Sequence, residues 1–428
     1  MVFDARQQEA AVLGKLRATA SEPGPELAAQ VSTILEAVRE EGDAALVRLE
    51  RQLDWSGYTV EDIRVPEAQT NAAYDQVAPE LLAALRRAIE NVRAFHEQDK
   101  PRSWETEREG LSLGSRFTPV DSAGIYTPAG QAPLPSSLYM CAVPAAVAGV
   151  RRLAVCTPPR KDGSLDALTL VAARECGVDE VYRLGGAVAI AALAYGTATV
   201  HRVNKVVGPG NQWVIEAKRQ VFGTVGIDSL AGPSESAIIA DDSADPALVA
   251  ADLLSQAEHA GDNMVILLSP SERLLDAVAA EAEKQATKLE RTALISESLG
   301  KHGALALTRD LAQAASLASA IAPEHLQLAV EHPETLAAQV KHAGCIFLGH
   351  WATVPLGDYA AGPSHVLPTG GTARFSSPLS VVDFMKRTSL VGVSPEALER
   401  IGPDTIALAK AEGLTAHAAA VRRRLDLL

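Results

Sequence analysis

The sequence predicts an α/β fold with two parallel-sheet domains and helical extensions at both ends of the chain. Between about residues 121 and 379, short apolar runs typical of strands alternate with helical patterns, which is the rhythm of parallel βαβ units. The chain has 428 residues, enough for roughly three folding units, and 47% of them are hydrophobic. These values indicate large apolar cores and exclude a mostly disordered chain.

Residues 1–120 are expected to be mainly helical. Pro25–Leu53 and Pro79–Gln98 place Leu, Ala and Val at three- and four-residue spacing between charged residues, as amphipathic helices do. The stretch 55–68 between them is expected to be loop or short strand. We interpret this region as a scaffold that contributes to dimer contacts and to the catalytic lobe.

Residues 121–233 and 234–379 are expected to form the two α/β domains, both Rossmann-like in their alternation of strand and helix. The strands expected in the first are 124–127, 153–157, 180–184 and 205–207, and in the second 237–240, 264–268, 292–296, 326–329 and 345–348. The helices expected between them are 136–148, 164–176, 187–195, 212–221, 246–259, 272–290 and 311–321. Parallel sheets bind ligands at the carboxyl ends of their strands, so we expect the chemistry there.

Residues 380–428 are predicted to be helical again, ending in an Ala-rich helix over 414–428.

Charge and composition narrow the class of partner and compartment. With 53 Asp and Glu against 39 Lys and Arg, the net charge is −14, and an acidic surface repels nucleic acid and anionic membranes. The longest apolar stretches, such as Cys141–Val150, reach about half the length that a transmembrane helix needs. The first ten residues contain no apolar run of a secretory signal, and the four cysteines form no CxxC pair. We therefore expect a cytoplasmic enzyme.

Three glycine loops could bring backbone amides close to a phosphate: Thr127–Gln131, Gly185-Gly186 and Gly208–Asn211. The last is the strongest candidate, because a strand ends at Val207, two glycines permit close approach and Asn211 suits a helix N-cap. None is a GxGxxG fingerprint followed by an acidic residue. A simple βα turn is the alternative for each.

Two short segments carry titratable or metal-binding side chains next to expected helices. Gln256 and His259 are three residues apart, so on a helix they share a face and could bind one zinc ion. The alternative for His259 is an interaction with the last helical carbonyls. Glu324 and His325 follow Pro323 on an expected loop and are typical of proton transfer, with a surface pair as the alternative.

Two further segments hold an acid and a histidine each. Asp358 and His365 lie in a loop rich in Gly and Pro, and Glu412 and His417 flank the start of the last helix. Solvated turn or surface residues are the alternative in both cases. Cysteines lack metal-site spacing and no GxSxG elbow is present, so any metal would be held by N and O donors from distant segments.

The order and spacing of a dozen motifs across nearly the whole chain resemble the histidinol dehydrogenase family. The matching segments are GIYTP at 124–128, PSS at 135–137, GGA at 185–187, IAALAYGT at 190–197, GPGN at 208–211, EAKRQ at 216–220, IDSLAGPSE at 227–235, SQAEH at 255–259, APEH at 322–325, GDY at 357–359, HVLPT at 365–369, DF at 383–384 and EGLTAH at 412–417.

The resemblance implies a four-electron oxidation of L-histidinol to L-histidine through histidinal, the last step of histidine biosynthesis, with one zinc ion and two NAD. The implied zinc ligands are Gln256, His259, Asp358 and the partner subunit's His417, because the family forms an intertwined homodimer. The zinc would hold the substrate's imidazole and amino nitrogens.

The resemblance also assigns roles to single residues. His325 would take the hydroxyl proton and assist the second oxidation, and Glu324 would activate the water that adds to the aldehyde. Other substrate contacts, besides His325 and the zinc ligands, would be Ser234, His365 and Glu412. Cofactor contacts would be Tyr126, Asn211 and the position of Val188.

Three positions depart from the family pattern. Val188 replaces a usual Gln, which predicts weaker NAD binding; Ala129 replaces a usual Gly, and Ser364 a usual Asn. One alternative is a related zinc and NAD dehydrogenase for another polyol or amino alcohol, such as a sulfopropanediol, although the intact Glu412 and His365 favour histidinol. Another is a binding or regulatory protein that kept the fold and lost cofactor use.

Overall fold

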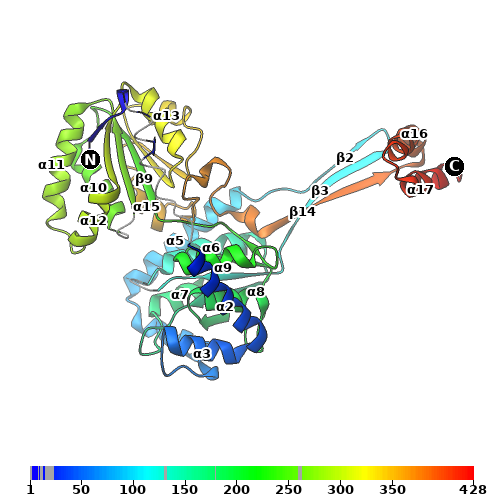
Figure 1. Cartoon of the computed structure of the whole chain (residues 1–428), viewed down its shortest axis with the longest axis horizontal. Coiled ribbons are helices and arrows are strands. Elements are labelled where there is room, and N and C mark those ends of the chain that lie inside the picture. The colour runs from blue at the N-terminus through cyan, green and yellow to red at the C-terminus, as the bar shows by residue number, and fades with distance from the viewer. Residues whose placement is uncertain are drawn as a thin grey trace.

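The computed structural model describes residues 2–7, 9, 13–14, 24–129, 133–178, 180–258 and 263–428. In this part of the chain, two parallel sheets form two α/β domains, and a third, antiparallel sheet forms an arm that projects from them (Figure 1). None of the described helices combines the length and apolar character needed to cross a membrane.

The first α/β domain contains a five-stranded parallel sheet in the order β6-β5-β4-β7-β8. Its strands are β4 (Ser122–Tyr126), β5 (Arg152–Thr157), β6 (Glu180–Arg183), β7 (Lys205–Val207) and β8 (Gly226–Ile227). Its helices are α6 (Pro135–Ala148), α7 (Ala167–Glu175), α8 (Gly186–Tyr195) and α9 (Gln212–Val221). The buried strands explain why this segment reads as nearly continuous apolar runs.

The helices before residue 100 complete the two cores of this first domain. They are α2 (Pro25–Glu41), α3 (Asp43–Leu53), the short α4 (Glu67–Ala72) and α5 (Pro79–Gln98). Helices α2 and α3 pack with α8 and α9 on one face of the sheet, and α5 packs on α6 on the other. The amphipathic pattern read from the sequence is thus explained by burial against this sheet.

The second α/β domain contains a six-stranded parallel sheet in the order β1-β11-β10-β9-β12-β13. Its strands are β1 (Val2–Asp4), β9 (Glu235–Ala240), β10 (Met264–Ser269), β11 (Gly303–Leu307), β12 (His325–Ala329) and β13 (Cys345–Leu348). Its helices are α10 (Pro246–Ala257), α11 (Glu272–Ala286), α12 (Thr292–His302), α13 (Leu311–Ile321), α14 (Pro333–Ala337) and α15 (Val354–Tyr359). When the strands of each domain are numbered by their order in the chain, leaving out β1, both sheets have the spatial order 3-2-1-4-5. This shared order confirms two similar Rossmann-like halves.

One strand predicted in the second domain is wrong. Residues 292–296 begin helix α12, whose Ile295 and Ser298 are buried at helical spacing. The segment is too short for its Thr and Ile residues to distinguish a strand from a helix by composition. The third strand is instead β11, whose Gly-Ala-Leu-Ala-Leu sequence lacks β-branched residues.

The arm consists of β2 (Trp104–Arg108), β3 (Leu111–Pro119) and β14 (Met385–Val393) in the antiparallel order β14-β3-β2, and it carries α16 (Pro395–Ala411) and α17 (Thr415–Leu425) at its tip (Figure 1). The expectation of helix is therefore wrong for residues 104–119 and 385–393. Strands β2 and β14 are exposed at most positions, and the buried residues of β3 are the adjacent Gly114 and Ser115. The arm strands therefore lack the one-sided apolar alternation that identifies a strand in a sequence.

Candidate active site

The candidate residues of the second domain gather at the amino ends of its strands. Glu235 is the first residue of β9 and His325 the first of β12, and these two strands are neighbours. Helix α10 runs back between β9 and β10, so its last turn brings Gln256 to the same edge. The expectation of a site at the carboxyl ends is therefore wrong for this sheet.

Glu324 and His325 form a buried acid–imidazole pair, and the alternative of a surface pair is wrong. Their side chains are 9% and 5% exposed, and Glu324 Oε2 lies 3.6 Å from His325 Nδ1. The backbone N–H of Glu235 donates to Glu324 Oε2 at 3.0 Å, which holds the carboxylate in place. As expected, α13 ends before Pro323, at Ile321, although His325 itself begins β12.

The imidazole of His325 lies between two carboxylates. Its Nε2 atom is 3.6 Å from Asp358 Oδ1, and its Nδ1 atom is 3.3 Å from the backbone oxygen of Glu235. Burial lowers the pKa of His325, but the charges of Glu324 and Asp358 outweigh it, so the pKa is raised overall. The carbonyl of Glu235 can only accept, so in the neutral imidazole the proton that faces it is on Nδ1, and Nε2 is the nitrogen that can take a proton.

Gln256 has a buried side chain at this edge whose amide lacks a hydrogen-bond partner among the described residues. It is 1% exposed, and neither Oε1 nor Nε2 has a hydrogen-bond partner among the described residues. A buried polar group without a partner costs about 1–3 kcal/mol, so this amide fits a ligand such as a metal ion. His259, the neighbour predicted to share that ligand, lies outside the described residues.

His365 is held by the loop that also carries Asp358. Its Nδ1 atom donates to the backbone oxygen of Asp358 at 2.8 Å, and its Nε2 atom lies 3.3 Å from Ser137 Oγ. The neighbouring Ser364 hydroxyl donates to the backbone oxygen of Met140 on α6 at 3.2 Å. The loop is therefore fixed to the first domain. Ser234, predicted to contact substrate, is half-buried directly before β9.

Glu412 and His417 are not brought to this edge within one chain. Both are exposed, and they lie in the helical tip of the arm, far from the second α/β domain (Figure 1). Among the described residues, no group of three or more His, Cys, Asp and Glu side chains could hold a metal ion. One chain thus supplies only part of the predicted donor set.

Glu235 is a site residue that the sequence analysis did not identify. Its side chain is buried, and its Oε1 atom accepts a hydrogen bond from the N–H of Gly370 at 3.0 Å. Burial, followed by the nearby charge of Glu324, raises its pKa to about 7. The available signal was a lone carboxylate at the start of an otherwise apolar strand.

The predicted cofactor residues lie at the carboxyl ends of the first sheet. Tyr126 ends β4, and its hydroxyl accepts the N–H of Gly186 at 3.1 Å. Glu50 Oε1 accepts the N–H of Gly185 at 2.9 Å, so the amides of this glycine loop are already bonded within the protein. A simple βα turn therefore describes this loop best.

The loop after β7, residues 208–211, leads into helix α9 as predicted. Asn211 caps α9, and its side-chain oxygen accepts the N–H groups of Trp213 and Val214 at 3.0 and 3.3 Å. Val188 lies on α8, fully buried in the apolar core between α8 and the sheet. A cofactor contact at position 188 stays a prediction.

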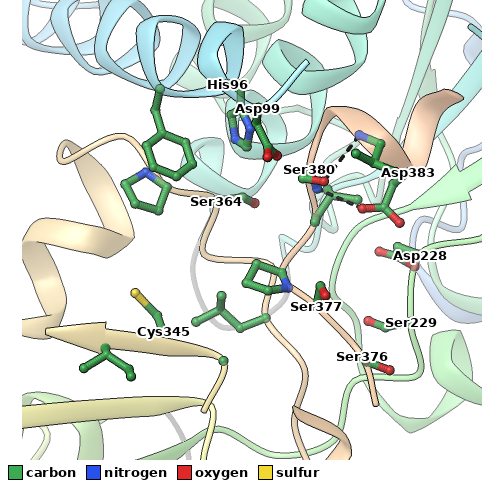
Figure 2. Close-up of a pocket in the computed structure, with 18 residues that line it drawn as sticks. His96, Asp99, Asp228, Ser229, Cys345, Ser364, Ser376, Ser377, Ser380 and Asp383 are labelled. Carbon is green, nitrogen blue, oxygen red and sulfur yellow. Dashed lines mark hydrogen bonds between the residues drawn. The ribbon is translucent and has the colours of Figure 1, made fainter. Parts of the chain in front are cut away.

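A cavity of about 780 Å³ separates the two α/β domains beside this site. Figure 2 shows Cys345, the first residue of β13, on one side of it and Asp228, which follows β8, on the other. The backbone N–H of Cys345 donates to the backbone oxygen of Glu324 at 2.9 Å. Cys345 is the register partner of His325, so the cavity lies beside the strand that carries the pair, although neither Glu324 nor His325 lines it. It gives a small molecule room between the domains.

Two Rossmann-like domains with a buried acid–imidazole pair beside the cavity between them define an α/β enzyme equipped for proton transfer. The family model described as histidinol dehydrogenase matches residues 17–425. The chain is 49% identical over 420 residues to the histidinol dehydrogenase of Cereibacter sphaeroides, covering 98% of this chain and 95% of the relative. It is 48% identical over 397 residues to that of Halalkalibacterium halodurans, covering 92% and 93%.

A solved structure agrees with these relatives. The crystal structure of histidinol dehydrogenase from Elizabethkingia anophelis superposes with a TM-score of 0.94 at 35% identity, covering 100% of this chain and 97% of that one. The chain belongs to the histidinol dehydrogenase family and is an oxidoreductase.

Proposed function

We propose that this protein oxidises L-histidinol to L-histidine through histidinal, in two successive hydride transfers, as the last step of histidine biosynthesis. Family membership supports the substrate. The observation that carries the proposal is the buried Glu324–His325 pair. His325 Nε2 lies 3.6 Å from Asp358 Oδ1, at the edge where the Gln256 amide has no hydrogen-bond partner among the described residues. Alcohol and aldehyde oxidation both require a base at the reacting carbon.

The residues at this edge fit a zinc ion. Gln256 and Asp358 offer oxygen donors. His259, which lies outside the described residues, and the partner subunit's His417 would complete the four ligands that the family resemblance implies. Zinc, when bound, would hold the substrate's imidazole and amino nitrogens and so orient the carbinol carbon. The unpartnered amide of Gln256 supports this assignment.

His325 would act first. Its Nε2 atom takes the hydroxyl proton while the carbinol carbon loses hydride, and the charges of Glu324 and Asp358 stabilise the imidazolium that forms. NAD, when bound at the carboxyl ends of the first sheet, would accept the hydride in each oxidation. Tyr126 and Asn211 lie at that edge.

Glu324 would act second. Its carboxylate takes a proton from the water that adds to the aldehyde, and His325 assists the second oxidation by accepting the hydroxyl proton of the hydrate. The bond from the Glu235 N–H keeps this carboxylate oriented. Ser234 and His365 would contact the substrate from the two sides of the edge.

A homodimer would supply the remaining groups. The arm exposes large apolar side chains, with Trp104 55%, Val391 71% and Leu408 67% exposed, as expected for a surface that a second copy covers. We propose that Glu412 of the partner subunit and the partner subunit's His417 complete the substrate and zinc sites. No nucleic acid or membrane takes part.

The test is NADH formation from L-histidinol with the purified protein, before chelation, after chelation and after zinc is added back. We expect two NADH per histidinol, loss of activity on chelation and recovery with zinc. Binding of histidinol without turnover would instead support a regulatory protein. Faster turnover of a sulfopropanediol than of histidinol would support a related dehydrogenase.

A further inference from the structure

A buried ion pair in the first domain lies within two of the family motifs and has no role in the function proposed above. Lys218 on α9 pairs with Asp228, which follows β8, and both side chains are 3% exposed. Burying two charges costs several kcal/mol per ion unless each finds further hydrogen bonds. The further hydrogen bonds of Lys218 and Asp228 indicate which part of the backbone this ion pair holds in place.

Both charges bond the backbone of the same residue, Gly208. The ammonium of Lys218 donates to the carbonyl oxygen of Gly208 at 3.0 Å, and the N–H of Gly208 donates to Asp228 Oδ2 at 2.7 Å. One peptide position is thus held from both sides by an ion pair whose members come from a helix and from the next strand. We call these three residues the Gly208 clamp.

The Gly208 clamp fixes a backbone that other residues could not adopt. Gly208 has a φ of +114°, and a Cβ atom there would lie 2.2 Å from the backbone oxygen of Tyr126. The loop therefore runs directly against the end of β4 and then enters α9 at its cap, Asn211. A shift of Gly208 would move both predicted cofactor residues relative to one another.

We propose that Lys218 and Asp228 are positioning residues that hold the Gly208–Asn211 loop in the shape that binds the cofactor. The inference rests on the proposed function, because it assigns NAD to this edge of the first sheet. Neither side chain needs to touch the cofactor, since each is 3% exposed and bonds the backbone of Gly208. The pair acts through Gly208 and the N-terminus of α9, which favours negative charge.

The variants must remove the clamp without leaving a buried charge. Lys218→Met with Asp228→Leu removes both charges together, whereas either single change would leave an unpaired ion that could unfold the protein. Asp228→Asn combined with Lys218→Met keeps an acceptor for the Gly208 N–H and loses only the donor to its carbonyl. Arg152→Met is the control, because Arg152 pairs with Glu180 near the amino end of the same sheet.

Two measurements test the clamp independently of turnover. Hydrogen exchange of the Gly208 amide reports the loop itself, and calorimetry reports the dissociation constant of NAD. For the Lys218→Met, Asp228→Leu double variant we expect about tenfold faster exchange of the Gly208 amide and about tenfold weaker NAD binding. The Lys218→Met, Asp228→Asn double variant should show smaller changes, and the Arg152→Met control should show none. In steady-state assays the KM for NAD should rise while the KM for histidinol and kcat stay within about twofold.

The outcomes separate this inference from the proposed function. Wild-type protein that binds no NAD refutes both. Wild-type protein that binds NAD, with double variants of unchanged NAD affinity or unchanged Gly208 exchange, refutes the positioning role alone. Equal rises in both KM values together with a lowered Tm would show a purely structural ion pair and would also overturn it.

Discussion

Glu235 makes the stability of this protein depend on pH in a direction opposite to that of most carboxylates. Burial and the charge of Glu324 raise its pKa from 4.5 to about 7. An acid with a raised pKa binds more protons when folded than when unfolded, so the folded state loses stability as pH rises from about 4.5 to about 7. At 1.36 kcal/mol for each pKa step, this loss is at most about 3 kcal/mol.

Glu235→Gln removes that loss and keeps the hydrogen bond, because an amide oxygen can still accept the N–H of Gly370. The variant should therefore match wild type near pH 5, or fall slightly below it, and exceed its free energy of unfolding by up to about 3 kcal/mol near pH 8.

The assay is urea unfolding of the metal-free protein at both pH values, with Glu105→Gln as a control on the exposed arm. The control should show the same pH trend as wild type. A Glu235→Gln variant whose advantage over wild type is equal at the two pH values would refute the reasoning.

Four other substitutions test the site. Glu324→Gln should still accept the Glu235 N–H but slow the release of the second NADH by about 10²–10⁴-fold, and a normal second phase would exclude Glu324 as the base. His325→Gln should slow the first hydride transfer by a similar factor while histidinol binding, measured by calorimetry, persists. Gln256→Ala should lower the zinc content after dialysis without lowering the Tm of the metal-free protein, because the side chain makes no hydrogen bond to any residue that the structure describes; a normal zinc content counts against it. Val188→Gln should strengthen NAD binding by about 0.5–1.5 kcal/mol and lower the Tm, since Val188 is fully buried. An unchanged dissociation constant for NAD would contradict a cofactor contact at position 188.

The parts of the fold that the sequence predicts well are those buried on one side or both. The strands of the two α/β domains read as apolar runs because helices cover both faces of their sheets. The strands of the arm were missed for the opposite reason, since β2 and β14 are mostly exposed and the buried residues of β3, Gly114 and Ser115, give no apolar alternation. The pairing of β2 with β3 is determined by backbone hydrogen bonds and by the Glu109-Gly110 turn, where both residues have positive φ. The pairing of β14 with β3 joins segments far apart in the chain.

Single residues of the candidate site could be predicted from the sequence only where neighbouring residue types form a recognisable local pattern. The Glu324–His325 pair and the Asn211 cap follow from adjacent residue types. Glu235 was missed because one carboxylate at a strand start has no local signature, and its role depends on Gly370, which is 135 residues away. His417 is exposed on the arm of one chain, so its predicted role depends on the proposed homodimer.

The candidate residues lie at the carboxyl ends of the strands in the first sheet and at the amino ends in the second, and this difference has an electrostatic reason. The first sheet presents its carboxyl edge, where helices such as α9 begin, and a helix N-terminus favours an anion such as a phosphate. The second presents its amino edge, where α10 and α13 end, and a helix C-terminus favours a cation. Asp228 and Cys345 line one cavity from these two different edges. Two copies of one topology, placed with unlike edges toward each other, thus support the proposed assignment of the phosphate-bearing cofactor to the first sheet and of zinc and an imidazolium to the second.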